Sequence, residues 1–293
     1  MSFIAVIGAG ELGGAVAARL ARLDRVARVL LVDRERGVAE GKALDIRQAG
    51  PIDGFRTSVD AADDPNAARG AAVVVVAPAF AQRASAGPQA AGPDAGDGSE
   101  ALLDALARLA SSDARTVVVF AEASPLAVME RALGERRVAG RRLVGSAPLA
   151  FASAVRALVA ASIDRSPAGV SLAVAGRPPE PIVLWSGATI DGSPVEEAVD
   201  PAVLAAIRRR LPALWPPGPH ALASAAARVG VAIAVGSRRL FPCWVGLDEP
   251  PAARGRVAAM PVELGPQGII RTVPPVMSPH ERVLVENALA RGR

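Results

Sequence analysis

Three glycines near the N-terminus stand at a spacing that suits phosphate binding. Gly8, Gly10 and Gly13 form the pattern G-x-G-x-x-G between a short apolar run and a segment with helical periodicity. Gly8 permits a tight turn, Gly10 lets a pyrophosphate approach the backbone, and Gly13 lets helix and strand pack closely. Asp33 closes the next apolar run, about 20 residues further on, where a carboxylate accepts hydrogen bonds from ribose hydroxyls. This pattern predicts a dinucleotide site.

The predicted cofactor residues lie at the first helix N-terminus, where backbone amides face phosphates, and at the ends of the apolar runs. They are Gly8, Gly10, Glu11, Leu12, Gly13, Asp33, Ala77 and Ser124. Asp33 favours NAD, whereas Arg34 and Arg36 are the kind of residue that holds the extra phosphate of NADP, which leaves NADP as the less favoured cofactor. Because no cluster of Cys and His occurs, we expect no metal site.

The elements that must position these residues alternate between strand and helix. The sequence predicts strands at 3–8, 29–33, 71–80, 116–125 and 142–147, and helices at 11–23, 38–49, 99–110 and 125–135. Such alternation is typical of a Rossmann-type, doubly wound parallel sheet. From about residue 147 the pattern changes: helices at 151–163, 200–211, 221–235 and 278–292 surround strand 169–176 and a hairpin at 257–273. We therefore predict an α/β fold with a dinucleotide-binding domain at 1–146 and an α+β domain at 147–293.

Two features of the first domain are interpreted from local signals. Gly50 and Pro51 are expected to stop the helix at 38–49, and Ser99 is expected to cap the helix at 99–110. The Gly-, Pro- and Ala-rich segment 81–99 follows a strand at the edge where α/β sheets bind ligands. It is interpreted either as a mobile lid or as a plain surface loop.

Composition excludes several other classes of function. The 33 basic and 29 acidic residues leave a net charge of +4, and the short Arg clusters lack the neighbouring aromatic residues of a nucleic-acid platform. The apolar run 221–235 is interrupted by Arg228 and is too short for a membrane span, so we expect a buried helix. A single cysteine, Cys243, and the lack of a leader-like N-terminus favour a cytoplasmic protein.

Three blocks of sequence resemble the malate/lactate dehydrogenase family, and malate dehydrogenases most closely. They are "LVDRERGVAEGKALDIRQAGPIDGF" at 31–55, "SPLAVM" at 124–129 and the C-terminal block "RRLFPCWVGLDE … MPVELGPQGIIRTV". The resemblance covers nearly the whole chain and is weakest at 81–99 and 186–220. It implies NAD as cofactor, a substrate-type C-terminal domain, a small anionic substrate, and assembly as a homodimer or homotetramer.

The resemblance also implies where catalytic groups should stand. The family's general-base His falls on Arg177, its orienting Asp on Phe151, and its carboxylate-clamping Arg on Ala154. The Asn that precedes Pro-Leu in the family falls on Ser124. The paired lid arginines fall near Gln82 or Arg83 and on Ser99, so at most one of them is kept. Because a guanidinium cannot act as a base near neutral pH, the family's proton transfer is lost.

Three hypotheses follow. In the first, the chain is an NAD-binding homologue whose 2-hydroxy-acid dehydrogenase activity is lost or altered. In the second, it is an active oxidoreductase with a rebuilt site, in which Arg177, Glu180 and Arg83 bind another anion and Glu180 or a water moves the proton. In the third, it is a structural or regulatory partner of an active paralogue, which the apolar face of 221–235 would permit, although a core or homodimer contact explains that face equally well. His220 and His280, the two histidines, are expected at surface or capping positions.

Overall fold

The structure is a computed structural model, and it describes residues 2–77, 95–177, 181–247 and 255–290. The helices are α1 (Glu11–Leu23), α2 (Arg36–Asp53), α4 (Ala95–Ser112), α5 (Leu126–Gly134), α6 (Ala147–Ser162), α7 (Val195–Ala198), α8 (Pro201–Arg210), α9 (Pro219–Val235) and α10 (Pro279–Ala290). The strands are β1 (Phe3–Ile7), β2 (Arg28–Val32), β3 (Ser58–Ala62), β4 (Val73–Val76), β5 (Val117–Phe120), β6 (Leu143–Gly145), β7 (Val170–Ala175), β8 (Ile182–Ile190), β9 (Ser193–Pro194), β10 (Leu240–Gly246), β11 (Val257–Gly265) and β12 (Gly268–Thr272).

The strands form one large and one small sheet. The large sheet has nine strands in the order β12-β11-β10-β6-β5-β4-β1-β2-β3, and its first six strands in the chain run parallel. β10 pairs antiparallel with β6, and β11 and β12 follow it as further antiparallel strands, so these three strands extend the sheet beyond β6. Strand β4 reads Val-Val-Val-Val and is buried on both faces, as a central parallel strand must be. The predicted α/β class with a doubly wound sheet is confirmed.

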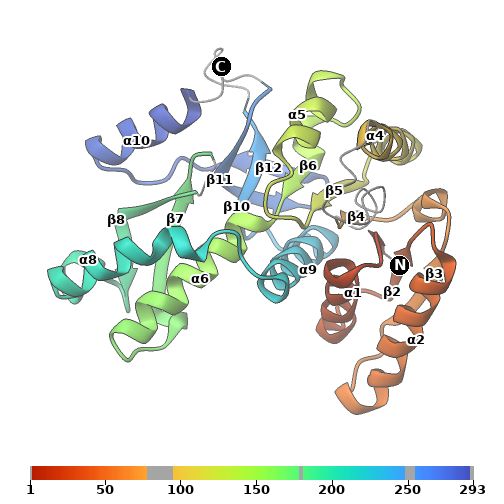
Figure 1. Cartoon of the computed structure of the whole chain (residues 1–293), viewed down its shortest axis with the longest axis horizontal. Helices are drawn as coiled ribbons and strands as arrows, with labels where there is room; N and C mark the ends of the chain where they lie inside the picture. The colour runs from red at the N-terminus through yellow and green to blue at the C-terminus, as the bar shows by residue number, and fades with distance from the viewer. Residues whose placement is uncertain (1, 78–94, 178–180, 248–254, 291–293) are drawn as a thin grey trace.

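Helices cover both faces of this sheet (Figure 1). α1, α2 and α9 share one apolar cluster with one face, and α4 and α5 share another cluster with the opposite face. In Figure 1, α9 lies between α1 and α6, and it contacts both of them. The small antiparallel sheet β7-β8-β9 packs with α6 and α8 in a third cluster. The sheet crosses the predicted boundary near residue 146, which itself stays a prediction.

Local corrections concern the ends of two helices. α2 does not stop at Gly50 and Pro51 but continues to Asp53, because a proline in the last turn disturbs few helical bonds. Gly54 ends the helix in the left-handed conformation (φ 77°), and its N–H bonds the carbonyl of Gly50 at 2.8 Å. Ser99 is no cap, since α4 already begins at Ala95. Strands β3, β8 and β9 were missing from the sequence-based prediction, and β10 lies in the C-terminal block that only the family resemblance marked.

The apolar helix α9 is packed into the interior of the protein. Nine of its residues are buried, and it packs against α1, α6, β4 and β5. This burial removes the face that the third hypothesis offered to a partner. Among the described residues, no single helix combines the length and apolar character of a membrane span; only the pair Pro201–Leu214 and Pro219–Val235, bent by 88°, reaches them together.

Candidate functional site

The glycine turn between β1 and α1 has the geometry of a phosphate cradle. Gly8 has φ 101°, a conformation that favours glycine, and donates its N–H to the carbonyl of Val32 at 2.8 Å. A Cβ on Gly13 would lie 1.8 Å from the carbonyl oxygen of Gly8, so this position must be glycine. The first intrahelical bond runs from Gly14 to the carbonyl of Gly10 at 2.9 Å. The amides before it point along the helix axis toward the turn, as an anion site requires.

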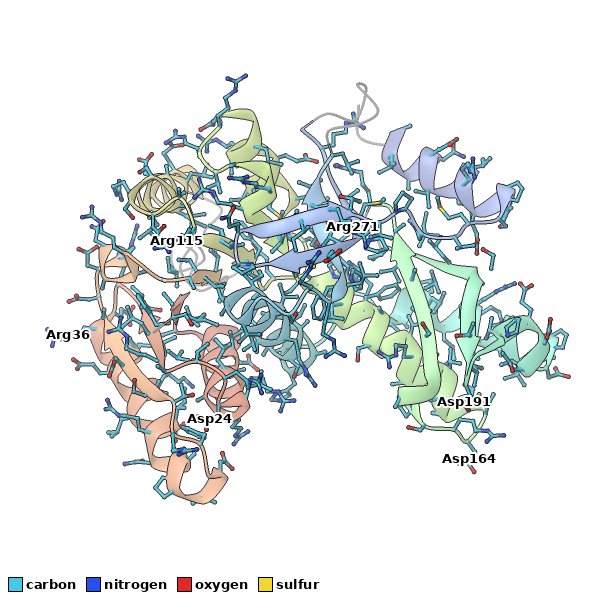
Figure 2. The ribbon with its side chains drawn as sticks, turned by 180° about the vertical axis from the view of Figure 1, so that it is seen from behind. Asp24, Arg36, Arg115, Asp164, Asp191 and Arg271 are labelled. Atoms are coloured by element: carbon cyan, nitrogen blue, oxygen red, sulfur yellow. The ribbon has the colours of Figure 1, made fainter. Side chains whose placement is uncertain are left out.

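Asp33 lies directly beside this turn, because β2 pairs with β1. It is only 6% exposed and accepts hydrogen bonds from the N–H of Ala9 at 2.7 Å and of Glu35 at 3.1 Å. Each carboxylate oxygen accepts one of these bonds and keeps a lone pair for a further donor. Arg36 pairs with Glu40 at 2.7 Å on the exposed side of α2, and Figure 2 shows it at the outer margin of the molecule.

The remaining predicted cofactor residues stand at the same edge of the sheet. Ala77 follows β4, is buried, and donates its N–H to the carbonyl of Ile7 at 2.9 Å. Ser124 follows β5 and is exposed. The strand order reverses between β1 and β4, and dinucleotides bind across such a switch point at the carboxyl ends of the strands. Glu11 and Leu12 open α1 at the same place.

Arg177, which stands where the family's base is expected, is committed to contacts within the protein. Gly176 pairs with Ala259 of β11 through two backbone hydrogen bonds, which fixes the residue that follows. The Arg177 guanidinium forms an ion pair with Glu130 of α5 and donates to the carbonyl of Val257 at 2.8 Å. Its side chain is 14% exposed. The same Glu130 oxygen accepts the N–H of Val257 at 2.9 Å, so all three elements are joined.

The positions expected for the orienting Asp and the clamping Arg are apolar. Phe151 is fully buried and meets Trp215 edge to face, with ring centroids 5.7 Å apart. Trp215 meets Trp244 in the same way at 6.0 Å. Ala154 is half-buried. We call Phe151, Trp215 and Trp244 the aromatic trio; it fills the interior with carbon where the family resemblance implies a charged pair.

Other residues are placed as follows. Arg156, which lies two residues beyond Ala154 on α6 and was not among the predicted site residues, donates to the carbonyl of Pro167 at 2.9 Å. His220 and His280 are exposed, at the starts of α9 and α10, in agreement with the surface positions predicted for them. Gln82, Arg83 and Glu180 lie outside the described residues, and so does most of the segment 81–99.

Comparison with known proteins shows similarity to lactate/malate dehydrogenases. Residues 3–87 match the NAD-binding domain of lactate/malate dehydrogenases. A malate dehydrogenase of Thioalkalivibrio sulfidiphilus is 28% identical over 304 aligned positions, which cover 100% of this chain and 98% of that protein. A malate dehydrogenase of Salinibacter ruber is 27% identical over an alignment that covers 91% of this chain and 87% of that protein. The chain is thus similar over its whole length to malate dehydrogenases, and its N-terminal part matches the NAD-binding domain of lactate/malate dehydrogenases.

Solved structures of the family share the fold. The malate dehydrogenase of Salinibacter ruber superposes with a TM-score of 0.83 at 24% identity, over 98% of this chain and 94% of the other. The lactate dehydrogenase of Cryptosporidium parvum, solved with lactic acid and nicotinamide adenine dinucleotide, has a TM-score of 0.83 at 20% identity and covers 99% and 95% of the two chains. The domain match confirms NAD as the predicted cofactor, and the cradle and the buried Asp33 fit that group.

Two residues of the site region were not found by reading the sequence. Glu122 follows β5, is half-buried, and has its pKa raised by burial. A lone acid just beyond an apolar strand was the signal that could have found it. Glu130 shows no such signal, because it looks like any polar residue of a surface helix. Among the described residues, no group of three or more His, Cys, Asp or Glu is arranged to hold a metal ion.

Proposed function

We propose that this chain binds NAD or NADH at residues 8–13 and does not exchange hydride with malate or lactate by the route of its family. The glycine cradle and Asp33 support the binding half of this proposal. The loss of the family's proton acceptor and carboxylate clamp supports the other half.

The observation that carries the proposal is the ion pair between Arg177 and Glu130. A guanidinium keeps its proton throughout the physiological pH range and cannot take a proton from an alcohol. It is also bound on both sides, by Glu130 and by the carbonyl of Val257, so freeing it to clamp a substrate would leave Glu130 without its cation. Arg177 therefore acts as a structural link between β7, α5 and β11.

The expected loss of rate is large. Removing a general base alone lowers a rate by about 10² to 10⁴. Phe151 and Ala154 remove the orienting carboxylate and the clamp as well, although such losses do not simply multiply, since the groups act as a unit. Turnover of malate, oxaloacetate, lactate or pyruvate should accordingly fall to the level of the buffer control.

Two measurements on the purified chain test this. Binding of NADH is followed by the fluorescence of the reduced nicotinamide, and turnover of the four acids by the absorbance of NADH. We expect saturable binding without turnover, loss of binding in Gly13→Ala, and retained binding in the neighbouring Gly14→Ala, whose Cβ meets only the flexible stem of Lys42. Brisk reduction of oxaloacetate would overturn the proposal, and absence of binding by either nucleotide would overturn its first half.

A second candidate is an oxidoreductase with a rebuilt site, and one observation favours it. Glu122 is a half-buried carboxyl at the carboxyl edge of the sheet, and burial raises its pKa, which makes the carboxylate a better proton acceptor than an exposed one. NADH-dependent reduction of a carbonyl compound without a carboxylate, lost in Glu122→Gln, would favour this candidate. Turnover unchanged in that variant would speak against it.

Assembly is proposed from the family resemblance alone. We expect a homodimer or homotetramer in solution. Light scattering that returns the mass of one chain, 29.8 kDa, would contradict this.

A further inference from the structure

Glu122 is held in place through both of its chain neighbours. The N–H of Ala121 bonds the carbonyl of Val76 at the end of β4, at 2.9 Å. The carbonyl of Ala123 accepts the indole N–H of Trp244 at 3.0 Å. Trp244 in turn belongs to the aromatic trio. The backbone of Glu122 is thus fixed at the carboxyl edge of the sheet, next to an apolar interior.

The carboxyl of Glu122 has no hydrogen-bond or ion-pair partner among the described residues. The strands β4, β5, β6 and β10 around it contain no charged residue. On α5, Glu130 and Arg131 are the charged residues, and both are engaged in ion pairs. On α6 the one charged residue, Arg156, is bonded to a backbone carbonyl. Burial alone acts on Glu122 and raises its pKa, so its negative charge is left without compensation from the described protein.

The position of Glu122 relative to the cradle follows from the strand order. Asp33 marks the adenosine half of the dinucleotide site, on the β2 side of the switch point between β1 and β4. The other half of a dinucleotide extends over the carboxyl ends of β4 and β5, which is the side where Glu122 stands. That half ends in nicotinamide, whose ring carries one positive charge when oxidised and none when reduced.

We propose that Glu122 makes this chain select the oxidised dinucleotide over the reduced one. The inference rests on the NAD binding proposed above. An ionised Glu122 is an anion that the described residues leave uncompensated, and the oxidised ring is the cation that compensates it. The reduced ring carries no charge, so the protonated, neutral form of the Glu122 carboxyl is favoured when NADH is bound. Selection is therefore linked to a proton: binding of NAD⁺ releases one from Glu122, and binding of NADH does not.

Linkage fixes the sign of the expected pH dependence. If NAD⁺ favours the ionised carboxyl, then ionisation of the carboxyl must favour NAD⁺ by the same factor. The preference for NAD⁺ over NADH should thus rise with pH as Glu122 titrates and level off above it. We expect a total change of about 5- to 150-fold in the ratio of the two dissociation constants, the usual size of such coupling.

The test measures both dissociation constants by calorimetry from mildly acidic to mildly basic pH. The variants are Glu122→Gln and, as a matched control, Glu286→Gln, which changes an exposed carboxylate on α10. We expect the ratio to depend on pH in the wild type and in the control, and to be flat in Glu122→Gln. A wild-type ratio that is flat, or a slope that persists in Glu122→Gln, would overturn the inference while leaving the proposed function intact.

A second measurement needs no variant. Titrating NAD⁺ into the wild-type chain in two buffers of different ionisation enthalpy counts the protons released on binding. We expect net release with NAD⁺ and none with NADH near the pKa of Glu122. Equal proton counts for the two nucleotides would overturn the inference. Absence of binding by both nucleotides would instead mark failure of the proposed function.

Discussion

Replacing Arg177 by Met should destabilise the chain through Glu130. The substitution keeps an unbranched apolar stem, though a shorter one, and removes the charge and both hydrogen bonds, to Glu130 and to the carbonyl of Val257. Glu130 would keep only the N–H of Val257 as a donor. An anion that loses its cation in a partly buried place is costly, because water reaches it incompletely.

The burial of the pair sets the size of the effect. The side chains of Arg177 and Glu130 are 14% and 30% exposed, which places the pair between surface ion pairs, at about 0–1 kcal/mol, and buried ones, at about 3–5 kcal/mol when one partner is removed. We expect Arg177→Met to lower the free energy of unfolding by about 3 kcal/mol. With about 2.1 cal/mol/K of unfolding entropy per residue, this corresponds to a fall in Tm of about 5 °C for a chain of this length.

A double-mutant cycle separates the pair from other effects of the substitution. Glu130→Gln and the double variant are compared with Arg177→Met by thermal and urea unfolding, and Arg210→Met on an exposed position of α8 serves as a control. We expect a coupling free energy of about 2 kcal/mol between positions 177 and 130 and no change in the control. A coupling near zero, or an Arg177→Met variant as stable as the wild type, would refute a structural role for Arg177. It would indicate instead that the guanidinium is available to a ligand.

Further predictions concern the cradle, the sheet edge and the C-terminal helix. Gly13→Ala should cost on the order of 3 kcal/mol in unfolding free energy, because its Cβ meets a backbone carbonyl at 1.8 Å, whereas Gly14→Ala should stay within about 1 kcal/mol of wild type; urea melts compare the two. Because burial raises the pKa of Glu122, the folded chain binds a proton that the unfolded chain has released, so stability should fall as pH rises from the ordinary carboxyl pKa to the raised one. Glu122→Gln should abolish that fall in Tm measured against pH, and a slope that stays the same would contradict the assignment. Glu281, buried at the start of α10, accepts bonds from three backbone N–H groups and one hydroxyl, so Glu281→Ala should cost about 3 kcal/mol, against about 0.5 kcal/mol or less for the exposed Glu286→Ala. Equal denaturation midpoints for these last two variants would be inconsistent with an anchoring role.

The sign for Glu281 can be checked by pH as well. Burial opposes ionisation of its carboxyl, but the hydroxyl of Ser186 and the N–H groups of Ser278, Ser186 and Trp185 outweigh it, and the pKa is lowered. The stability that it contributes is therefore present above the ordinary carboxyl pKa and is lost as pH falls through the lowered one. Glu281→Ala lacks this contribution, so the wild type should lose more unfolding free energy than the variant as pH falls through this range, measured by urea melts at each pH.

The sequence by itself determined the features that depend on neighbouring residues. The spacing of Gly8, Gly10 and Gly13 and the acid at position 33 predicted the cradle, since a turn, a helix start and a strand end are each built from contiguous residues. α1 was predicted at the bounds that the structure has. The alternation of apolar runs with helical segments gave the fold class for the same reason. β3 and β8 were missed because their strand signals are weak or mixed with polar residues, and only pairing with a neighbour makes them strands.

The tertiary structure decided what the altered site can do. The chemistry of a guanidinium alone shows that Arg177 cannot act as a base. Its engagement by Glu130 and Val257, which lie 47 and 80 residues away in the chain, also keeps it from clamping a substrate, and only the fold shows this. The carboxyl of Glu122 likewise depends on the fold, because the described elements packed around it bring no cation. Sequence patterns record what each residue can do with its neighbours, whereas packing between distant elements decides which groups are already paired and which are left for a ligand.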